Sequence, residues 1–185
     1  MPRPFKSGAN FLFTMINSKN QEPKDNREEA LLKAKSDALR LLTFSARSVE
    51  ELRSRLKMKR FGAEIIDDVV ESFQKQGLLN DEKFAELYAN SRVYTRPTGK
   101  RQVETDLKKK GVPSKIISET LAKMSDYDEK KAARDLVYGR FQKMTGVSRE
   151  KKKARLFAFL KRRGFDTNII FKVLSELFSE IQEEA

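Results

Sequence analysis

Apolar side chains recur at intervals of three and four residues along nearly the whole chain from about residue 27. This spacing places them on one face of a helix, whereas a half-buried strand would alternate every second residue. The pattern predicts nine helical segments that fall into groups of three. Only eight glycines and five prolines occur in 185 residues, too few for the closely spaced turns of an all-β protein. We therefore predict an all-α fold.

A short motif occurs three times, and each copy precedes a pair of isoleucines. The copies read LKMKRF at residues 56–61, LKKKGV at residues 107–112 and LKRRGF at residues 160–165. Their first residues, Leu56, Leu107 and Leu160, are 51 and 53 positions apart. A nearly fixed period indicates one supersecondary unit used repeatedly. The sequence thus predicts three tandem three-helix repeats, with any function spread along a surface rather than confined to one pocket.

Local signals indicate where the helices begin and end. Ser48 and Glu51 have capping-box spacing, and Asn80 and Ser148 stand at the expected starts of other helices. Gly77 is placed to end a helix in the left-handed conformation. Together these signals predict a flexible leader and three repeats, at residues 1–26, 27–79, 80–125 and 126–185.

The first copy of the motif departs from the other two. Arg60 stands where the later copies have Gly111 and Gly164. A side chain there must either accept the left-handed conformation at some cost or shift the turn to Gly62.

Composition excludes several kinds of chemistry. Cysteine and histidine are both absent, so disulfides, Cys/His zinc sites and histidine-dependent nucleophiles are impossible. The adjacent acids Asp67 and Asp68 would point about 100° apart on a helix rather than converge. Lys100 follows Thr-Gly but lacks the upstream glycine of a phosphate-binding loop. We predict no enzyme activity, no metal site and no cofactor.

Membrane association is not expected either. The longest early apolar run, residues 11–16, is far too short to cross a bilayer. It also lacks the features of a secretory signal. The sequence therefore predicts a cytoplasmic protein.

The net charge of +12 is unevenly distributed. It amounts to +3 over residues 1–36, −1 over residues 37–82, and +5 over each of residues 83–126 and 127–185. A basic middle and end are typical of a protein that approaches a polyanion.

Two kinds of basic position lie within these segments. Cations in the last turn of a helix stabilise the helix dipole by roughly 0.3–1 kcal/mol each, which explains part of their placement. Cations at the start of a helix are disfavoured there, so proximity to phosphates is a better explanation for them. A solvated helix end is the alternative. The candidate binding residues are Arg92, Arg96, Lys100, Arg101, Lys108, Lys109, Lys110, Arg149, Lys151, Lys152, Lys153, Arg155, Lys161, Arg162 and Arg163.

Contacts from these residues are expected to go to the backbone of single- or double-stranded DNA, independent of sequence, because lysine acts as a point charge. Tyr94 lies among the cations in sequence. It is either a stacking platform for a base or a half-buried packing residue.

Several stretches resemble the RecX family, the bacterial regulators of the recombinase RecA. The most characteristic is GLLNDEKFA at residues 77–85, which runs into Ser91 and Arg92. RSVEEL at residues 47–52, KGV at residues 110–112, and RGF at residues 163–165 leading to Val173 and Leu174 follow the same order and spacing. The resemblance covers about residues 36–180.

The resemblance implies a non-enzymatic cytoplasmic modulator that binds the RecA nucleoprotein filament and limits its growth or promotes its disassembly. Such a protein would regulate recombination, DNA repair and the SOS response. It also implies an elongated, curved array of the three repeats, and no dimerisation motif is evident, so a monomer is expected. Two alternatives remain open: a stand-alone single-stranded nucleic-acid-binding protein, and a helical scaffold whose charges serve only solubility.

Overall fold

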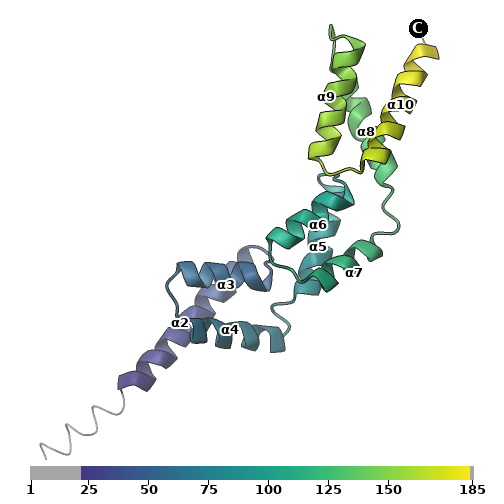
Figure 1. Ribbon diagram of the computed structural model, residues 1–185. Helices are drawn as coiled ribbons and strands as arrows, with labels where there is room; N and C mark the ends of the chain where they lie inside the picture. Colours follow the sequence, from purple (N-terminus) through teal and green to yellow (C-terminus); the bar gives the residue numbers. More distant parts are fainter. Residues whose placement is uncertain (1–21, 184–185) are drawn as a thin grey trace, which may run out of the picture. The chain divides into compact units, whose positions relative to one another are not determined.

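The computed structural model describes residues 22–183, with side chains for residues 26–180. Every regular element in this range is an α-helix, so the predicted all-α fold is confirmed (Figure 1). The predicted leader lies largely outside the described residues, although Glu22 to Asn26 form the first turns of a helix. The chain divides into two compact units, and each is described separately.

Unit 1 comprises α2 (Glu22–Phe44), α4 (Ala63–Lys75) and all but the first turn of α3 (Val49–Met58). Helices α2 and α4 pack against each other. The ion pairs within this unit include Arg27 to Asp68 at 2.7 Å and Lys59 to Asp37 at 3.0 Å. The predicted apolar stripe of α4 is buried, as the periodicity requires: Ile65, Ile66, Val69, Val70 and Phe73.

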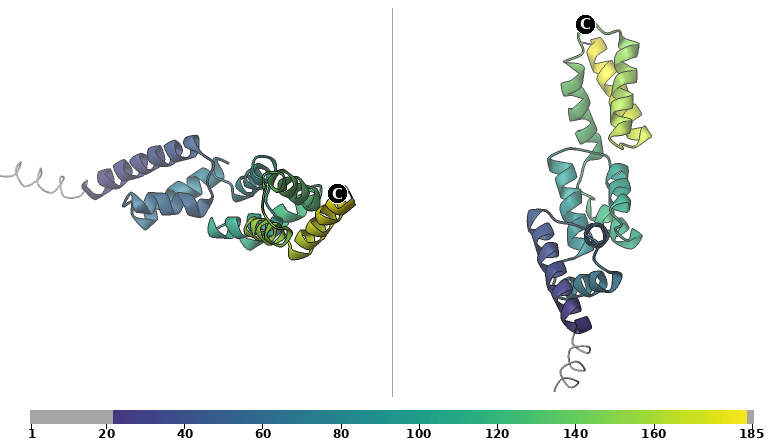
Figure 2. Two further views of the ribbon diagram at one scale, coloured as in Figure 1. Left: turned by 90° about the horizontal axis from the view of Figure 1, so that it is seen from above. Right: turned by 90° about the vertical axis from the view of Figure 1, so that its left-hand side faces the viewer.

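Unit 2 contains two three-helix groups and the short segment Arg47–Glu51, which includes the first turn of α3. The first group is α5 (Asp81–Tyr94), α6 (Lys100–Lys109) and α7 (Ser114–Lys123). The second is α8 (Glu129–Phe141), α9 (Arg149–Arg162) and α10 (Thr167–Glu183), and the helices of each group lie side by side (Figures 1 and 2). Each group has its own buried core, centred on Leu107 in the first and on Leu160 and Phe165 in the second.

The repeated motif is a helix-ending turn. In each copy the amide of the last motif residue donates to the carbonyl of the first, as Phe165 does to Leu160 at 3.2 Å. The preceding residue donates to the carbonyl three positions back, as Gly164 does to Lys161 at 3.0 Å. This pair of bonds defines a Schellman motif. The leucine that opens each copy is fully buried, so the motif is explained by helix termination and core packing.

Arg60 adopts the left-handed conformation, with φ of 67°, and the turn does not shift to Gly62. Its φ is close to those of Gly111, 74°, and Gly164, 72°. The first of the two expected outcomes is therefore the correct one, and Arg60 bears the cost of a Cβ in this region.

Most helix starts agree with the sequence signals. The capping box of Ser48 and Glu51 forms in both directions, at 3.1 and 3.3 Å, and Asn80 accepts from the Lys83 amide at 2.9 Å. Gly77 is left-handed as predicted. Ser148 is the N-cap residue of α9, as its predicted position requires, but its side chain forms no capping hydrogen bond. Ser148 is exposed, so water can satisfy the first amides of that helix.

Candidate nucleic-acid interface

The start of α6 packs against the end of α9 without any intervening side chain. The Gly99 amide donates to the Arg163 carbonyl at 2.9 Å, and the Arg163 guanidinium donates back to the Pro97 carbonyl at 2.9 Å. A Cβ on Gly99 would fall 2.0 Å from the Gly164 carbonyl oxygen. This contact, which we call the α6–α9 junction, therefore requires glycine on both sides of it.

Beside the α6–α9 junction, an acidic side chain of α8 contacts the start of α6. The Lys100 amide donates to the Glu129 carboxylate of α8 at 3.1 Å. Burial raises the pKa of Glu129, although this hydrogen bond and the Lys100 charge partly oppose the rise. The positive end of the α6 dipole is thus met by a carboxylate from the next three-helix group.

The same arrangement occurs at the start of α3. The Ser48 hydroxyl donates to the Lys110 carbonyl at 2.5 Å, and the Val49 amide donates to the Asp81 carboxylate at 2.9 Å. Burial raises the pKa of Asp81 as well. At both places the start of a helix contacts a helix-ending turn that lies more than sixty residues further along the sequence.

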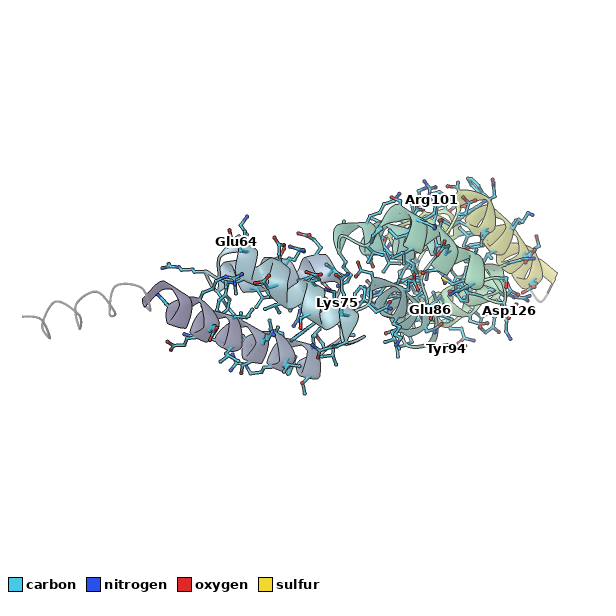
Figure 3. The ribbon with its side chains drawn as sticks, turned by 90° about the horizontal axis from the view of Figure 1, so that it is seen from below. Glu64, Lys75, Glu86, Tyr94, Arg101 and Asp126 are labelled. Carbon is cyan, nitrogen blue, oxygen red and sulfur yellow. The ribbon has the colours of Figure 1, made fainter. Side chains whose placement is uncertain are left out.

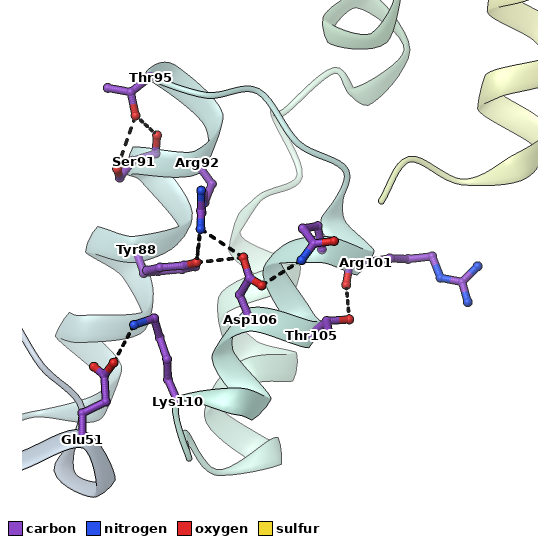
Figure 4. A network of polar contacts seen from close by, with 10 residues as sticks. Glu51, Tyr88, Ser91, Arg92, Thr95, Arg101, Thr105, Asp106 and Lys110 are labelled. Carbon is purple, nitrogen blue, oxygen red and sulfur yellow. Dashed lines mark hydrogen bonds and ion pairs between the residues drawn. The ribbon is translucent and has the colours of Figure 1, made fainter. Parts of the chain in front are cut away.

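Several predicted binding residues have structural partners instead. Lys110 pairs with Glu51 at 2.6 Å and lies over the ring of Tyr88 (Figure 4). Arg92 pairs with Asp106 at 3.2 Å and donates to the Tyr88 hydroxyl (Figure 4). These two cations stabilise the first three-helix group of unit 2, so much of their charge is already compensated.

Four more of the predicted cations make local contacts. Lys108 pairs with Glu104 along α6, and Lys161 donates to the Thr167 hydroxyl. Arg149 donates to the Phe178 carbonyl at 3.1 Å, and the Lys152 ammonium lies 4.5 Å from the centre of the Phe141 ring. Glu104 neutralises the charge of Lys108. The partners of Lys161, Arg149 and Lys152 are uncharged, so these three residues keep their positive charge.

The remaining predicted residues form no ion pair with a described residue, and all but one of them are exposed. Lys100 is half-buried, and its side chain forms no ion pair with a described residue. Seven others are exposed and have no side-chain hydrogen bond or ion pair within the described part of the chain. They are Arg96, Arg101, Lys109, Lys151, Lys153, Arg155 and Arg162.

These cations lie in three places. Arg101 and Lys161 line a shallow recess of about 200 Å³ beside Gly164, where α6 and α9 residues meet. The basic cluster from Arg149 to Arg155 lies toward the other end of that helix, roughly 9–18 Å from Lys161 along the helix axis at 1.5 Å per residue. Lys109 lies at the far end of α6. The structure therefore presents separate basic sites along unit 2.

One functional candidate was missed from the sequence. The Arg140 guanidinium lies 4.6 Å from the centre of the Phe159 ring, and Arg163 lies 5.2 Å from the same ring. Arg140 occupies the last turn of α8, where a cation is ordinary. Only the tertiary packing of α8 on α9 shows that it joins the residues of the α6–α9 junction.

Tyr94 lies on a different face of unit 2 from Arg101. Its side chain is 82% exposed, so the expectation of half-buried packing is wrong. It lines an open groove of about 890 Å³ with the acidic residues Glu86 and Asp126. Figure 3 shows Arg101 on the other side of unit 2 from these three residues.

Residues 22–183 contain no cluster of acidic side chains that could hold a metal ion. No helix among them is long and apolar enough to cross a membrane.

Successive three-helix groups, two of which meet at the α6–α9 junction, define a helical-repeat protein with basic surface sites. The chain matches the RecX first, second and third three-helix domains over residues 34–73, 80–121 and 126–174. It is 31% identical to the regulatory protein RecX of Amycolatopsis mediterranei, covering 85% of this chain and 90% of that protein. It is 35% identical to the regulatory protein RecX of Chlorobium phaeobacteroides, covering 76% of this chain and 91% of that protein. The chain belongs to the RecX family.

The fold is also similar to that of a solved relative. The crystal structure of RecX from Lactobacillus salivarius superposes with a TM-score of 0.70 at 22% identity, over 81% of this chain and 97% of that one. This likeness supports the three-helix repeat architecture independently of the sequence motifs.

Proposed function

We propose that this protein binds the RecA nucleoprotein filament and inhibits or destabilises it, and so modulates recombination, DNA repair and the SOS response. The carrying observation is family membership across all three three-helix domains. We further propose that the protein acts in the cytoplasm as a monomer and does not itself catalyse a reaction. The proposed repeats span residues 27–79, 80–125 and 126–185.

The exposed cations support contact with a polyanion. Lys151 lies in the first turn of α9, where the helix dipole disfavours positive charge, and Lys153 and Arg155 follow in the next turn. No described acidic side chain pairs with them. A nucleoprotein filament supplies phosphates that would compensate this charge.

The direct test measures RecA ATPase activity and strand exchange on single-stranded DNA with substoichiometric protein. Both rates should fall as the protein is added. If the protein is folded and neither rate changes, the proposed function is rejected.

A charge variant tests the α9 cluster within the same assay. K151Q/K153Q/R155Q should need several-fold more protein for half-maximal inhibition, because it removes three unpaired cations. The matched control is K130Q/K131Q/R134Q on α8, which removes the same charge where Lys130 and Arg134 pair with Glu176 and Glu180. Equal inhibition by the two variants would argue that the α9 cluster does not contact the filament.

A second function remains a candidate because the same cations could bind bare single strands. Affinity for an oligonucleotide and for the RecA filament, measured over a range of salt, separates the two functions. Equal affinity and equal salt sensitivity would favour the single-stranded nucleic-acid-binding protein.

A further inference from the structure

Four arginines come close together at the α6–α9 junction. Arg163 is partly buried there, and burial lowers the pKa of its guanidinium. Arg96, Arg140 and Arg92 lie near enough to lower that pKa further by repulsion. Four different segments supply these residues. Arg92 lies in the last turn of α5, Arg96 in the connection from α5 to α6, Arg140 in the last turn of α8, and Arg163 directly after α9.

Phe159 orders two of these side chains. The guanidinium carbons of Arg140 and Arg163 lie 4.6 and 5.2 Å from the centre of its ring. A guanidinium held close to an aromatic ring by a cation–π contact loses part of its side-chain freedom. The Phe159 ring therefore restrains both guanidinium groups before a ligand binds.

An acidic side chain compensates only one of these four charges. Arg92 pairs with Asp106, and Arg163 donates to the Pro97 carbonyl. Arg96 and Arg140 form neither kind of bond, and no described carboxylate pairs with Arg96, Arg140 or Arg163. Hydrogen bonds or ion pairs therefore account for Arg163 and Arg92. Arg140 contacts only the Phe159 ring and Arg96 has no such partner, although both add repulsion to the site.

We propose that Arg96, Arg140 and Arg163 bind consecutive phosphates of a single-stranded DNA backbone. A planar guanidinium fork matches a phosphate with two parallel hydrogen bonds. A nucleic-acid strand carries a higher density of negative charge than a folded protein surface, which suits three adjacent cations. The choice of ligand rests on the proposed function, since the RecA filament contains DNA, but the binding itself does not require RecA.

The test is fluorescence anisotropy of a fluorescein-labelled oligo(dT) with the full chain over a range of salt. R96Q/R140Q should bind about tenfold more weakly at low salt. The slope of log K against log salt should fall in magnitude by about 1.4, because each single-strand phosphate contact contributes about 0.7. Unchanged affinity and slope would overturn the proposal.

The matched control is K130Q/R134Q, which removes two ion-paired cations from α8. It should bind within about twofold of the wild type. An equal loss in both variants would show only a general effect of net charge, and would overturn the proposal. Arg96 and Arg140 are exposed, so circular dichroism should show unchanged melting for R96Q/R140Q.

Two further outcomes separate the ligands and the functions. If R96Q/R140Q binds oligo(dT) normally but loses binding to RecA without DNA, the site recognises an acidic protein surface and the proposal is overturned. If the wild type does not inhibit RecA, yet R96Q/R140Q loses oligonucleotide binding as expected, only the proposed function fails.

Discussion

Arg60 occupies a backbone conformation that glycine holds in the two later copies of the turn. The residue is exposed, so its cost is chiefly the left-handed φ. At Gly111 a second constraint operates, because a Cβ there would lie 2.4 Å from the Cβ of Glu50. Position 111 thus requires glycine for two reasons, its left-handed φ and its close packing against Glu50. At Arg60 only the left-handed φ disfavours a side chain.

This difference predicts opposite effects of two substitutions on the free energy of unfolding. Arg60→Gly should stabilise the protein by up to about 1 kcal/mol, since relief of left-handed strain outweighs the added freedom of the unfolded chain. Gly111→Ala should destabilise by about 2 kcal/mol, through strain and displacement of Glu50. Urea unfolding measures both.

Gly62→Ala is the control for these substitutions. Gly62 has φ of −66°, and a Cβ there would meet nothing within 4 Å. Its replacement should change the stability little. A destabilising Arg60→Gly would contradict the account of the turn.

The middle helices α3 and α6 begin against the helix-ending turn of the next repeat. In both cases a half-buried carboxylate, Asp81 or Glu129, accepts from the first helical amide. Burial raises the pKa of each acid despite these hydrogen bonds. The charged form is therefore less favourable in the folded protein than in the unfolded chain, which makes the junctions sensitive to pH.

Glu129 gives a prediction with a definite sign. Because its folded pKa is raised, the contribution of this acid to stability is fully present below its unfolded pKa and is lost as the pH rises through its folded pKa. Glu129→Gln can still accept from the Lys100 amide without burying a charge. We expect its Tm to exceed that of the wild type at pH 7.

The advantage of Glu129→Gln should shrink as the pH falls below about 4, where the wild-type carboxyl is also neutral. Thermal melts followed by circular dichroism at several pH values measure this. Asp135→Asn, at an exposed position on the same helix, is the control. A Glu129→Gln variant that is less stable at every pH would show that the charge on Glu129 stabilises α6 more than its burial costs.

Helix positions and local caps were predictable because their causes lie within a few residues. The three turns, the stripe of α4 and the capping box of Ser48 all depend on local hydrogen bonds and period. The α6–α9 junction was not predictable, because it joins Gly99 to residues more than sixty positions away. For the same reason the sequence did not reveal the role of Lys110 as an ion-pair residue or the position of Arg140 beside Phe159.

On the scale of the whole molecule, unit 2 carries opposite charges on two faces. One face holds Arg101, Thr105 and Lys161 around the recess beside Gly164. The other holds the groove around Tyr94, whose charged lining has four carboxylates and two lysines: Glu86, Asp126, Asp128, Asp135, Lys123 and Lys131. A polyanion should therefore approach the recess and avoid the groove, even though both faces are accessible.

A photo-crosslinking experiment tests this directional binding. A benzophenone amino acid replaces either Thr105 or Tyr94, two uncharged and exposed residues, so that neither replacement removes a cation. With fluorescein-labelled single-stranded DNA at low salt, the adduct at position 105 should be several-fold more abundant than that at position 94. Raising the salt should reduce the adduct at 105, since phosphate contacts weaken steeply with ionic strength. Equal labelling would mean that exposure rather than charge governs the approach, and stronger labelling at 94 would place the DNA in the groove.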